Sequence, residues 1–423
     1  MNTFFTKFKA IVGDKSLRNR IFLALGILAL FRFLSAIPIP NINQDALAQY
    51  INTNDFVGLL NIFTGGGLSV LSLVMLGVGP FITASIIMQL MTVLSPKLKS
   101  MATEEGQYGR KKIAMYSRLL TVPLAFVQAF SFIVILQKEG IMPTLDQFGL
   151  LVSVFVIVAG SMLLMWLGEL MTEFGIGNGV SMIIFAGIVA QLPQQVIALS
   201  ANYDPSMLIR YGVFAVIGIV IIYLVVAVTE AERPIPVTYA KQVRGGKMYG
   251  GASTYLPLKL NQSGVMPIIF ALSILVFPQM IINILSYSNW SWVAPAATFV
   301  NGLLQNQWFY GGMYFFLVFV FTFFYTAVTF DPHAISENLQ KSGAFIPGVR
   351  PGESTSTFLG KVVTRITLVG ALFLGLIAVL PVAIAGYTGD QSITIGGTSL
   401  LIAVSVVLEL VKKFDAQLAM REY

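Results

Sequence analysis

The chain has 423 residues, of which 56% are hydrophobic and only 11% are charged, and its mean hydropathy is +0.80. A soluble protein of this size could not cover so much apolar surface, so the composition predicts a polytopic helical membrane protein. With no Cys and one His, the chain has no disulfide framework, thiol nucleophile or multi-His metal site. It contains no GxxxxGK[ST] run, so we expect no nucleotide site, no cofactor and no enzyme.

Apolar runs long enough to cross a bilayer, about 20 residues each, recur along the whole chain. They predict an all-α membrane protein with ten transmembrane helices. The predicted helices cover residues 21–37, 73–94, 116–137, 150–172, 180–200, 207–229, 264–287, 309–330, 366–386 and 393–411.

Basic residues are concentrated between these apolar runs. The positive-inside rule places such segments on the cytoplasmic side, and with ten helices both termini lie there too. The net charge of +7 is then mainly a topology signal, with docking of an anionic partner or lipid as an additional use. Of the 26 Lys and Arg residues, 23 lie in residues 1–20, 95–118, 230–260, 330–365 and 411–423.

The segment Asn61–Ser72, with the sequence NIFTGGGLSVLS, precedes the second predicted helix and carries no charge. Its three consecutive glycines, Gly65–Gly67, weaken any helix and permit sharp bends. Non-helical backbone at membrane depth is tolerated only where protein or a water-filled cavity surrounds it. The composition leaves two interpretations open: a re-entrant loop on the outer face, or a movable stopper seated in a pore.

The second predicted helix should be kinked at its outer end by the Gly and Pro residues of 77–80. Beyond the kink, Ile82 and Ile86 share a face at i, i+4, and Ile184 and Ile188 repeat the spacing in the fifth helix. Such a stripe is most often ordinary helix packing. The alternative is a hydrophobic constriction that closes a pore by dewetting.

Two long polar segments interrupt the second half of the chain. In residues 230–260, β-forming residues at 237–239 and 248–255 flank Gly245-Gly246, which predicts a protruding β-hairpin. The segment 341–355, KSGAFIPGVRPGEST, is too polar and too rich in Pro and Gly to span a bilayer. A solvated connector is the simpler interpretation, but connectors are normally short. Two such basic loops on one side therefore favour a docking surface.

Charges within the predicted spans are few: Arg32 is the deepest, and Glu169 and Glu409 lie near helix ends. This scarcity argues against a secondary transporter with broken helices, which needs charged or polar groups at mid-membrane. A non-conducting insertase or scaffold is a third alternative.

Six stretches, in chain order, resemble the SecY family, the channel subunits of the general protein-export machinery. The resemblance covers nearly the whole chain. The stretches are FRFLSAIPIPNI (31–42), the 65–67 glycines with GPFITASIIMQL (79–90), EEGQYGRKKIAMYSRL (104–119), MWLGELMTEFGIGNGVSMIIFAGIVAQLP (165–193), PVTYAK (236–241) with STYLPLKLNQSGVMPIIFA (253–271), and DPHAISENLQKSGAFIPGVRPGEST (331–355) with TRITLVGALFLGLIAVLP (364–381).

The resemblance implies two inverted five-helix halves, residues 1–200 and 201–423, around an hourglass pore for unfolded polypeptides. A short re-entrant plug helix, about residues 61–72, would close the outer funnel, and an apolar ring would close the waist. The implied plug residues are Asn61, Gly65, Gly66, Gly67, Leu68, Val70 and Leu71. The implied ring residues are Ile82, Ile86, Ile184, Ile188, Ile274 and Ile402.

The resemblance also implies partners in a bacterial cytoplasmic membrane. A motor ATPase, SecA, and the ribosome would dock on loops 230–260 and 330–365, with SecE bracing the halves and SecG peripheral. Signal peptides would leave sideways into lipid between predicted helices 73–94 with 116–137 and 264–287 with 309–330. The implied docking residues are Arg350, Lys341, Arg244, Lys247 and Lys241.

Overall fold

The computed structural model divides the chain into two compact units. Unit 1 comprises residues 1–215, 272–310 and 381–423, and unit 2 comprises residues 216–271 and 311–380. The residues that the structure describes are 14–39, 46–47, 61, 64, 66–103, 105–143, 145–175, 177–201, 208–239, 242–244, 247–249, 253–285, 295, 298–300, 302–303, 306–388 and 392–419.

Each of the ten predicted helices corresponds to a helix in the described residues, so the predicted all-α class is confirmed. They are α2 (Lys15–Ser35), α5 (Gly79–Leu94), α7 (Gly106–Lys138), α8 (Gln147–Phe174), α9 (Gly179–Ala201), α10 (Leu208–Glu230), α11 (Met266–Leu285), α13 (Gln307–Thr329), α15 (Glu353–Thr388) and α16 (Ser392–Ala419).

Length and apolarity give a smaller number of membrane spans. Within the described residues, four helical segments are long and apolar enough to cross a bilayer. A fifth is added if α5 and the short α6 (Pro96–Thr103), bent by 105° at their junction, form one span. Three shorter apolar helices lie within α9, α10 and α11. The number of ten spans therefore stays a prediction.

The predicted start of the second helix at residue 73 is wrong. Residues 66–78, here called the turn segment, are turns except for Ser72, which forms an isolated β-bridge with Pro38, and α5 begins at Gly79. Gly77 has φ +58°, which is outside the right-handed helical region. Pro80 lies in the first turn of α5, where its missing N–H costs no helical hydrogen bond. The expected kink is thus the beginning of the helix.

In unit 1, α7 packs against α5 and α8, and α9 packs against α8 and α16. Leu68, Leu71 and Met75 of the turn segment lie in one buried cluster with residues of α7 and α8. Gly160 of α8 makes this packing possible, because a Cβ at that position would lie 2.1 Å from the carbonyl oxygen of Leu73. The backbone of the turn segment therefore lies directly on α8.

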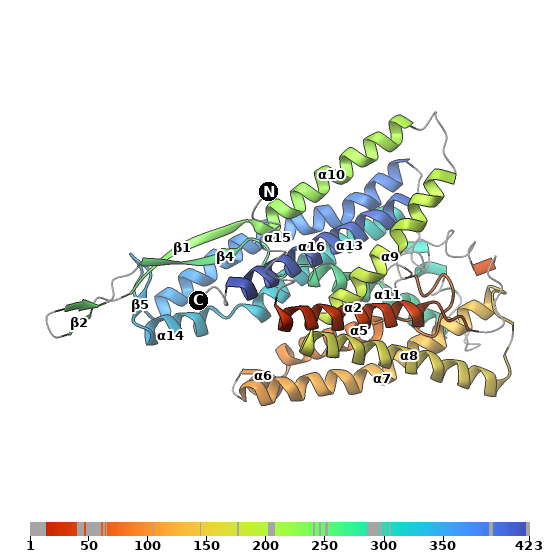
Figure 1. Cartoon of the computed structure of the whole chain (residues 1–423), viewed down its shortest axis with the longest axis horizontal. Helices are drawn as coiled ribbons and strands as arrows, with labels where there is room; N and C mark the ends of the chain where they lie inside the picture. The colour runs from red at the N-terminus through yellow and green to blue at the C-terminus, as the bar shows by residue number, and fades with distance from the viewer. Residues whose placement is uncertain are drawn as a thin grey trace. The chain divides into compact units, whose positions relative to one another are not determined.

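Unit 2 contains the predicted β-hairpin. Strand β1 (Glu232–Tyr239) pairs antiparallel with β4 (Ser253–Lys259), and the short β2 (Gln242–Arg244) and β3 (Lys247–Tyr249) pair beyond them. The hairpin projects as a long arm (Figure 1). The sequence did not predict that β5 (Ala344–Phe345) would join the other edge of β1. Segment 341–355 is thus part of a sheet in the order β4-β1-β5.

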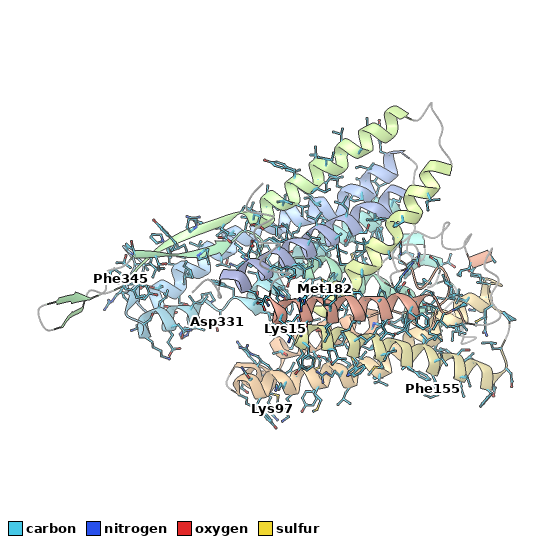
Figure 2. The ribbon with its side chains drawn as sticks, in the orientation of Figure 1. Lys15, Lys97, Phe155, Met182, Asp331 and Phe345 are labelled. Carbon is cyan, nitrogen blue, oxygen red and sulfur yellow. The ribbon has the colours of Figure 1, made fainter. Side chains whose placement is uncertain are left out.

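The sheet covers the beginning of α15 with an apolar layer. Ile235 and Val237 alternate with exposed residues along β1, as expected for a strand with one buried face. They pack with Leu258, Ala344 and Ile346, and with α15 through Leu359, Val362, Val363 and Ile366. Figure 2 labels Phe345 on β5, beside the hairpin. Together, β1, β4, β5, α14 (Pro332–Lys341) and residues 346–366 are called the platform.

Candidate functional site

The six predicted ring residues all lie in unit 1. Ile274 on α11 is half-buried, whereas the other five are buried. Burial fits both ordinary packing and a closed constriction, so the ring stays a prediction. The exposed fractions are 9% for Ile82 and 2% for Ile86 on α5, 1% for Ile184 and 3% for Ile188 on α9, and 1% for Ile402 on α16.

The predicted plug segment is held together by one side chain. The amide of Asn61 accepts from the backbone N–H of Ser69 at 2.9 Å and donates to the Ser69 hydroxyl at 2.6 Å. The Asn61 carbonyl oxygen accepts from the Gly66 N–H at 2.8 Å. Gly66 has φ +80°, a conformation that favours glycine. These bonds hold Asn61 close to Gly66 and Ser69.

The described residues 66–72 are turns and one β-bridge, so the predicted plug helix does not extend through them. Asn61 is helical, whereas Gly65 lies outside the described residues. Gly67, Leu68 and Leu71 are buried, and Val70 is half-buried. Leu71 has φ +46°, which is uncommon for a residue with a branched side chain and marks local backbone strain.

Two neighbours reach this loop from other helices. Gln191 of α9 donates from Nε2 to the Asn61 carbonyl oxygen at 3.1 Å. A Cβ at Gly66 would lie 3.6 Å from Gln191 Nε2 and 3.9 Å from an Nη of Arg32, so α2 also approaches here. The sequence suggested no surroundings for Arg32; the structure places its guanidinium beside the predicted plug segment.

A short backbone pairing ties the same segment to the end of α2. The Ile39 N–H donates to the Leu71 carbonyl oxygen at 2.9 Å, and the Leu73 N–H donates to the Ile37 carbonyl oxygen at 3.1 Å. Pairing of this kind satisfies backbone groups that would otherwise be buried without partners. Among the described residues, these bonds add to the apolar packing of Leu68 and Leu71 on α7 and α8.

On the platform, Arg350 is exposed and its backbone is fixed. Its carbonyl oxygen accepts from the Thr355 hydroxyl at 2.9 Å, and Thr355 is 2% exposed. Ser336 of α14 donates to the Gly352 carbonyl oxygen at 2.6 Å, and Ser336 is 3% exposed. Buried hydroxyls on both sides therefore hold the loop that presents Arg350.

The other predicted docking residues differ in their surroundings. Lys341 forms an ion pair with Glu337 at 2.8 Å, with both side chains more than half exposed. Solvent screens exposed pairs of this kind, so they add little stability. Arg244 lies on β2 and Lys247 on β3, at the tip of the hairpin. Lys241 lies outside the described residues.

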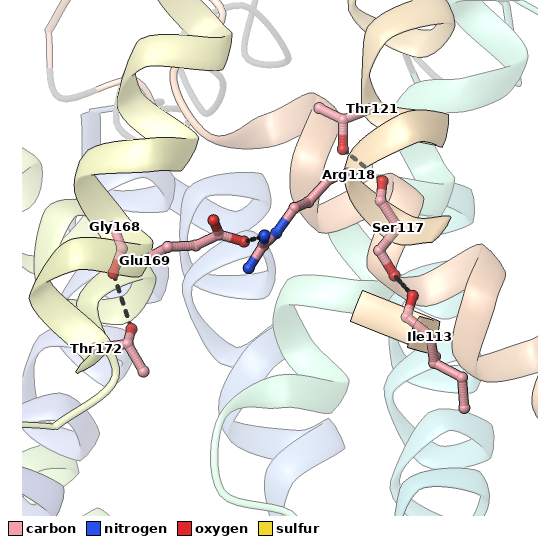
Figure 3. A network of polar contacts seen from close by, with 7 residues as sticks. All are labelled: Ile113, Ser117, Arg118, Thr121, Gly168, Glu169 and Thr172. Carbon is pink, nitrogen blue, oxygen red and sulfur yellow. Dashed lines mark hydrogen bonds and ion pairs between the residues drawn. The ribbon is translucent and has the colours of Figure 1, made fainter. Parts of the chain in front are cut away.

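The sequence placed Glu169 and Glu409 near helix ends, but their partners were missed. Glu169 of α8 accepts from Arg118 Nε of α7 at 2.5 Å (Figure 3). Glu409 pairs with Lys413 of its own helix at 2.8 Å. The i, i+4 spacing could have predicted the second pair. The first joins residues 51 positions apart, so the sequence alone held no signal for it.

The same region joins α8 to α9 through a close backbone contact. Thr172 donates to the Gly168 carbonyl oxygen at 2.8 Å (Figure 3), and it accepts from the Gly179 N–H at 2.8 Å. A Cβ at Gly179 would lie 2.0 Å from the Gly168 oxygen. Asn178 caps α9 by accepting from Val180 N–H at 3.1 Å. The glycines therefore set the separation of the two helices.

Long apolar helices, a buried glycine-rich loop between them and a polar platform define a polytopic helical membrane protein. A SecY family model matches residues 72–411, which is most of the chain. The chain belongs to the SecY family. It is 40% identical to the protein translocase subunit SecY of Streptomyces coelicolor, over 99% of this chain and 98% of the relative. It is 39% identical to that of Mycobacterium bovis, over 96% of each chain.

Solved structures share the fold at low sequence identity. One described as a protein-conducting channel superposes with a TM-score of 0.64 at 19% identity, covering 93% of this chain and 91% of the other. Sec61 in the canine ribosome-channel complex from the endoplasmic reticulum gives a TM-score of 0.60 at 18% identity, with the same coverage. The family model and the relatives thus confirm the predicted family, and the solved structures confirm its fold.

Proposed function

We propose that this chain is the protein-conducting channel subunit of a bacterial protein translocase, residing in the cytoplasmic membrane. It passes unfolded secretory polypeptides across the membrane and releases apolar segments laterally into lipid. The observation that carries the proposal is 40% identity to a translocase subunit over 99% of the chain. The near absence of charge in its predicted spans supports a passive channel over an ion-coupled transporter.

The ring of Ile82, Ile86, Ile184, Ile188, Ile274 and Ile402 forms the constriction in this proposal. Apolar side chains offer a passing polypeptide no fixed hydrogen-bond partner, so passage does not depend on its sequence. They also hold water poorly, which limits ion leakage when the pore is empty. The burial of five of the six side chains supports a tightly closed resting state.

Photo-crosslinking tests the channel directly. A crosslinking amino acid at Ile82 or Ile188 should form adducts with a stalled secretory chain. Phe155 on the outside of α8, 61% exposed and labelled in Figure 2, is the control position. Adducts only at Phe155 would favour a non-conducting insertase or scaffold and would contradict the channel.

Residues 61–72 act as the plug in this proposal. Their hydrogen bonds to the rest of unit 1, among the described residues, are a few backbone bonds and the Gln191 bond. Leu68 and Leu71 add buried apolar contacts with α7 and α8, which have no directional requirement and can form again when the segment returns. Deleting residues 65–70 should raise the ion conductance of the reconstituted channel. An unchanged conductance would show that the ring alone makes the seal.

The platform and the hairpin tip, residues 240–252, form the docking surface in this proposal, with Arg350, Lys341, Arg244, Lys247 and Lys241 contacting the SecA motor or the ribosome. The excess of basic residues in loops 230–260 and 330–365 also supports a cytoplasmic position for both loops and for both termini. SecE would brace the halves 1–200 and 201–423, and SecG would be peripheral. Copurification of a small tail-anchored SecE-like protein tests that assembly.

Reversing one charge tests the docking role. Arg350→Glu should impair motor-driven export while the protein still inserts into the membrane and binds SecE. Lys111→Glu is the matched control, because Lys111 is also exposed and lies on α7, outside both predicted docking loops. Normal export by Arg350→Glu, or an equal loss with Lys111→Glu, would count against a specific role for Arg350.

A further inference from the structure

A cavity of about 350 Å³ lies at the base of the hairpin, entirely within unit 2. Its lining combines an apolar floor with three charged side chains. That volume is at the low end of the range of about 300–1,000 Å³ for small-ligand sites. The lining residues are Ala231, Glu232, Arg233, Leu258, Leu260, Arg365, Ile366 and Val369.

Two backbone contacts build this cavity. The Leu260 N–H donates to the Ala231 carbonyl oxygen at 2.8 Å, which closes the base of the hairpin. A Cβ at Gly370 of α15 would lie 2.6 Å from the Leu260 carbonyl oxygen, so the hairpin base contacts α15 directly. The glycine allows this approach, and the strand base and the helix form fixed walls of the cavity.

The cavity lies where two apolar helices meet polar chain. The apolar α10 ends at Glu230, immediately before Ala231, Glu232 and Arg233. On α15, Arg365 directly precedes the apolar run 366–381. Both arginines are exposed, and neither has an ion-pair partner among the residues that the structure describes. Arginines at such a boundary attract the anionic headgroups of lipids.

An exposed apolar stripe continues from the cavity along α15. Val369, Leu372 and Leu376 follow Arg365 at i+4, i+7 and i+11, which places the four residues on one helix face. The three side chains are 54%, 42% and 63% exposed. A cationic site at one end of an apolar stripe is complementary to a phospholipid, which has an anionic phosphate at one end of an apolar chain.

We propose that this cavity binds the headgroup of an anionic glycerophospholipid, whose acyl chain lies along the stripe on α15. Arg233 and Arg365 bind the phosphate. Glu232 leaves the lining with a net charge of +1, which one phosphodiester neutralises. The Glu232 carboxylate also accepts from hydroxyls of a glycerol headgroup, which a choline headgroup lacks.

The test measures the melting temperature of the detergent-solubilised full-length protein during titration with dihexanoyl-phosphatidylglycerol. Dihexanoyl-phosphatidylcholine and inorganic phosphate are titrated separately. Phosphatidylglycerol should stabilise the protein at lower concentration than either. One Arg contact to an anionic lipid is worth about 1 kcal/mol. The half-effective concentration should therefore rise about five-fold in Arg365→Gln and in Arg233→Gln.

Lys361→Gln removes the same charge from α15 four residues before Arg365, outside the cavity, and should leave the half-effective concentration unchanged. If Arg365→Gln lowers the melting temperature even without lipid, its lipid response is confounded by lost stability. Arg233→Gln, on the hairpin, then gives an independent measurement of lipid binding. Equal effects of Lys361→Gln and Arg365→Gln would overturn the proposal. A full effect of inorganic phosphate would point to a free anion instead. Arg365→Gln could also keep its response to lipid and lose a copurifying membrane protein. That result would assign the site to a protein contact and overturn the proposal.

Discussion

The predicted plug region of unit 1 and the platform of unit 2 are both irregular in sequence, yet they are held in different ways. Among the described residues, the turn segment 66–78 is held mainly by apolar packing against α7 and α8, has left-handed residues including Leu71, and makes few hydrogen bonds to its surroundings. The platform has a seven-pair strand register between β1 and β4, its own apolar cluster and buried hydroxyls that fix the Arg350 loop.

This difference suits a channel that has no energy source of its own. A surface that receives force must keep its shape, whereas a seal that opens must be released at a small free-energy cost. Local stability in proteins is graded in this way, and moving elements come from its low end. We therefore expect substitutions in the two regions to have different consequences.

The largest effect is expected where the turn segment contacts α8. Gly160→Ala would place a methyl group 2.1 Å from the Leu73 carbonyl oxygen, so the turn segment must move. Overpacking of this kind destabilises by about 1–3 kcal/mol. We expect a lower melting temperature and a higher resting conductance in planar bilayers.

Gly149→Ala on the same helix is the control for that substitution. Its Cβ would meet only Leu145, at 3.7 Å, which is an ordinary contact. It should be neutral or slightly stabilising, because Ala favours a helix by about 0.5–1 kcal/mol over Gly. Equal behaviour of the two variants would contradict the tight seating of the turn segment.

On the platform, Ser336→Ala removes the hydroxyl that donates to the Gly352 carbonyl oxygen. Leaving that acceptor without its partner costs about 1–3 kcal/mol. We expect faster hydrogen exchange in residues 348–356 and weaker motor-driven export, with resting conductance unchanged. The exposed Ser342, which bonds only within its own helix end, supplies the control Ser342→Ala. A raised conductance in Ser336→Ala would break the separation of the two regions.

A smaller effect is expected at the contact between α9 and the predicted plug. Gln191→Leu removes the donor to the Asn61 carbonyl oxygen, a bond worth about 1 kcal/mol. Resting conductance should rise while export continues. The same change at the exposed Gln147 should alter neither property. If Gln191→Leu conducts no more than Gln147→Leu, the bond does not hold the segment in place.

The smallest effect is expected at the Arg118–Glu169 pair between α7 and α8. Arg118 is 49% exposed and Glu169 25% exposed, so solvent screens much of their attraction. Glu169→Gln should lower the melting temperature only slightly, consistent with about 0–1 kcal/mol for exposed pairs. A loss as large as that of Gly160→Ala would show that this pair, rather than glycine packing, joins the helices.

Much of this architecture could be predicted because hydropathy marks membrane helices, and α9 and α10 begin and end within one residue of their predicted limits. Hydropathy does not register helix that leaves the apolar layer. It therefore missed the polar first turns of α15, which begins at Glu353 rather than 366. It also placed helix on residues 73–78, which are apolar but form turns.

The site was predicted less completely, because its contacts join distant parts of the chain. The hairpin followed from local β-propensity and turn residues, whereas the pairing of β5 with β1 depends on more than a hundred residues of intervening chain. Gln191 had no local signal that it would meet Asn61. The lining of the headgroup cavity likewise comes from β1, β4 and α15.

Hydrogen exchange on the reconstituted translocase, with and without a stalled secretory chain, tests the contrast between the two regions most directly. With the stalled chain present, residues 66–78 should exchange faster, while β1 and β4 should keep the protection they show at rest. Unchanged protection of residues 66–78 with a chain in the pore, or loss of protection in β1 and β4 instead, would contradict a yielding seal served by a rigid docking platform.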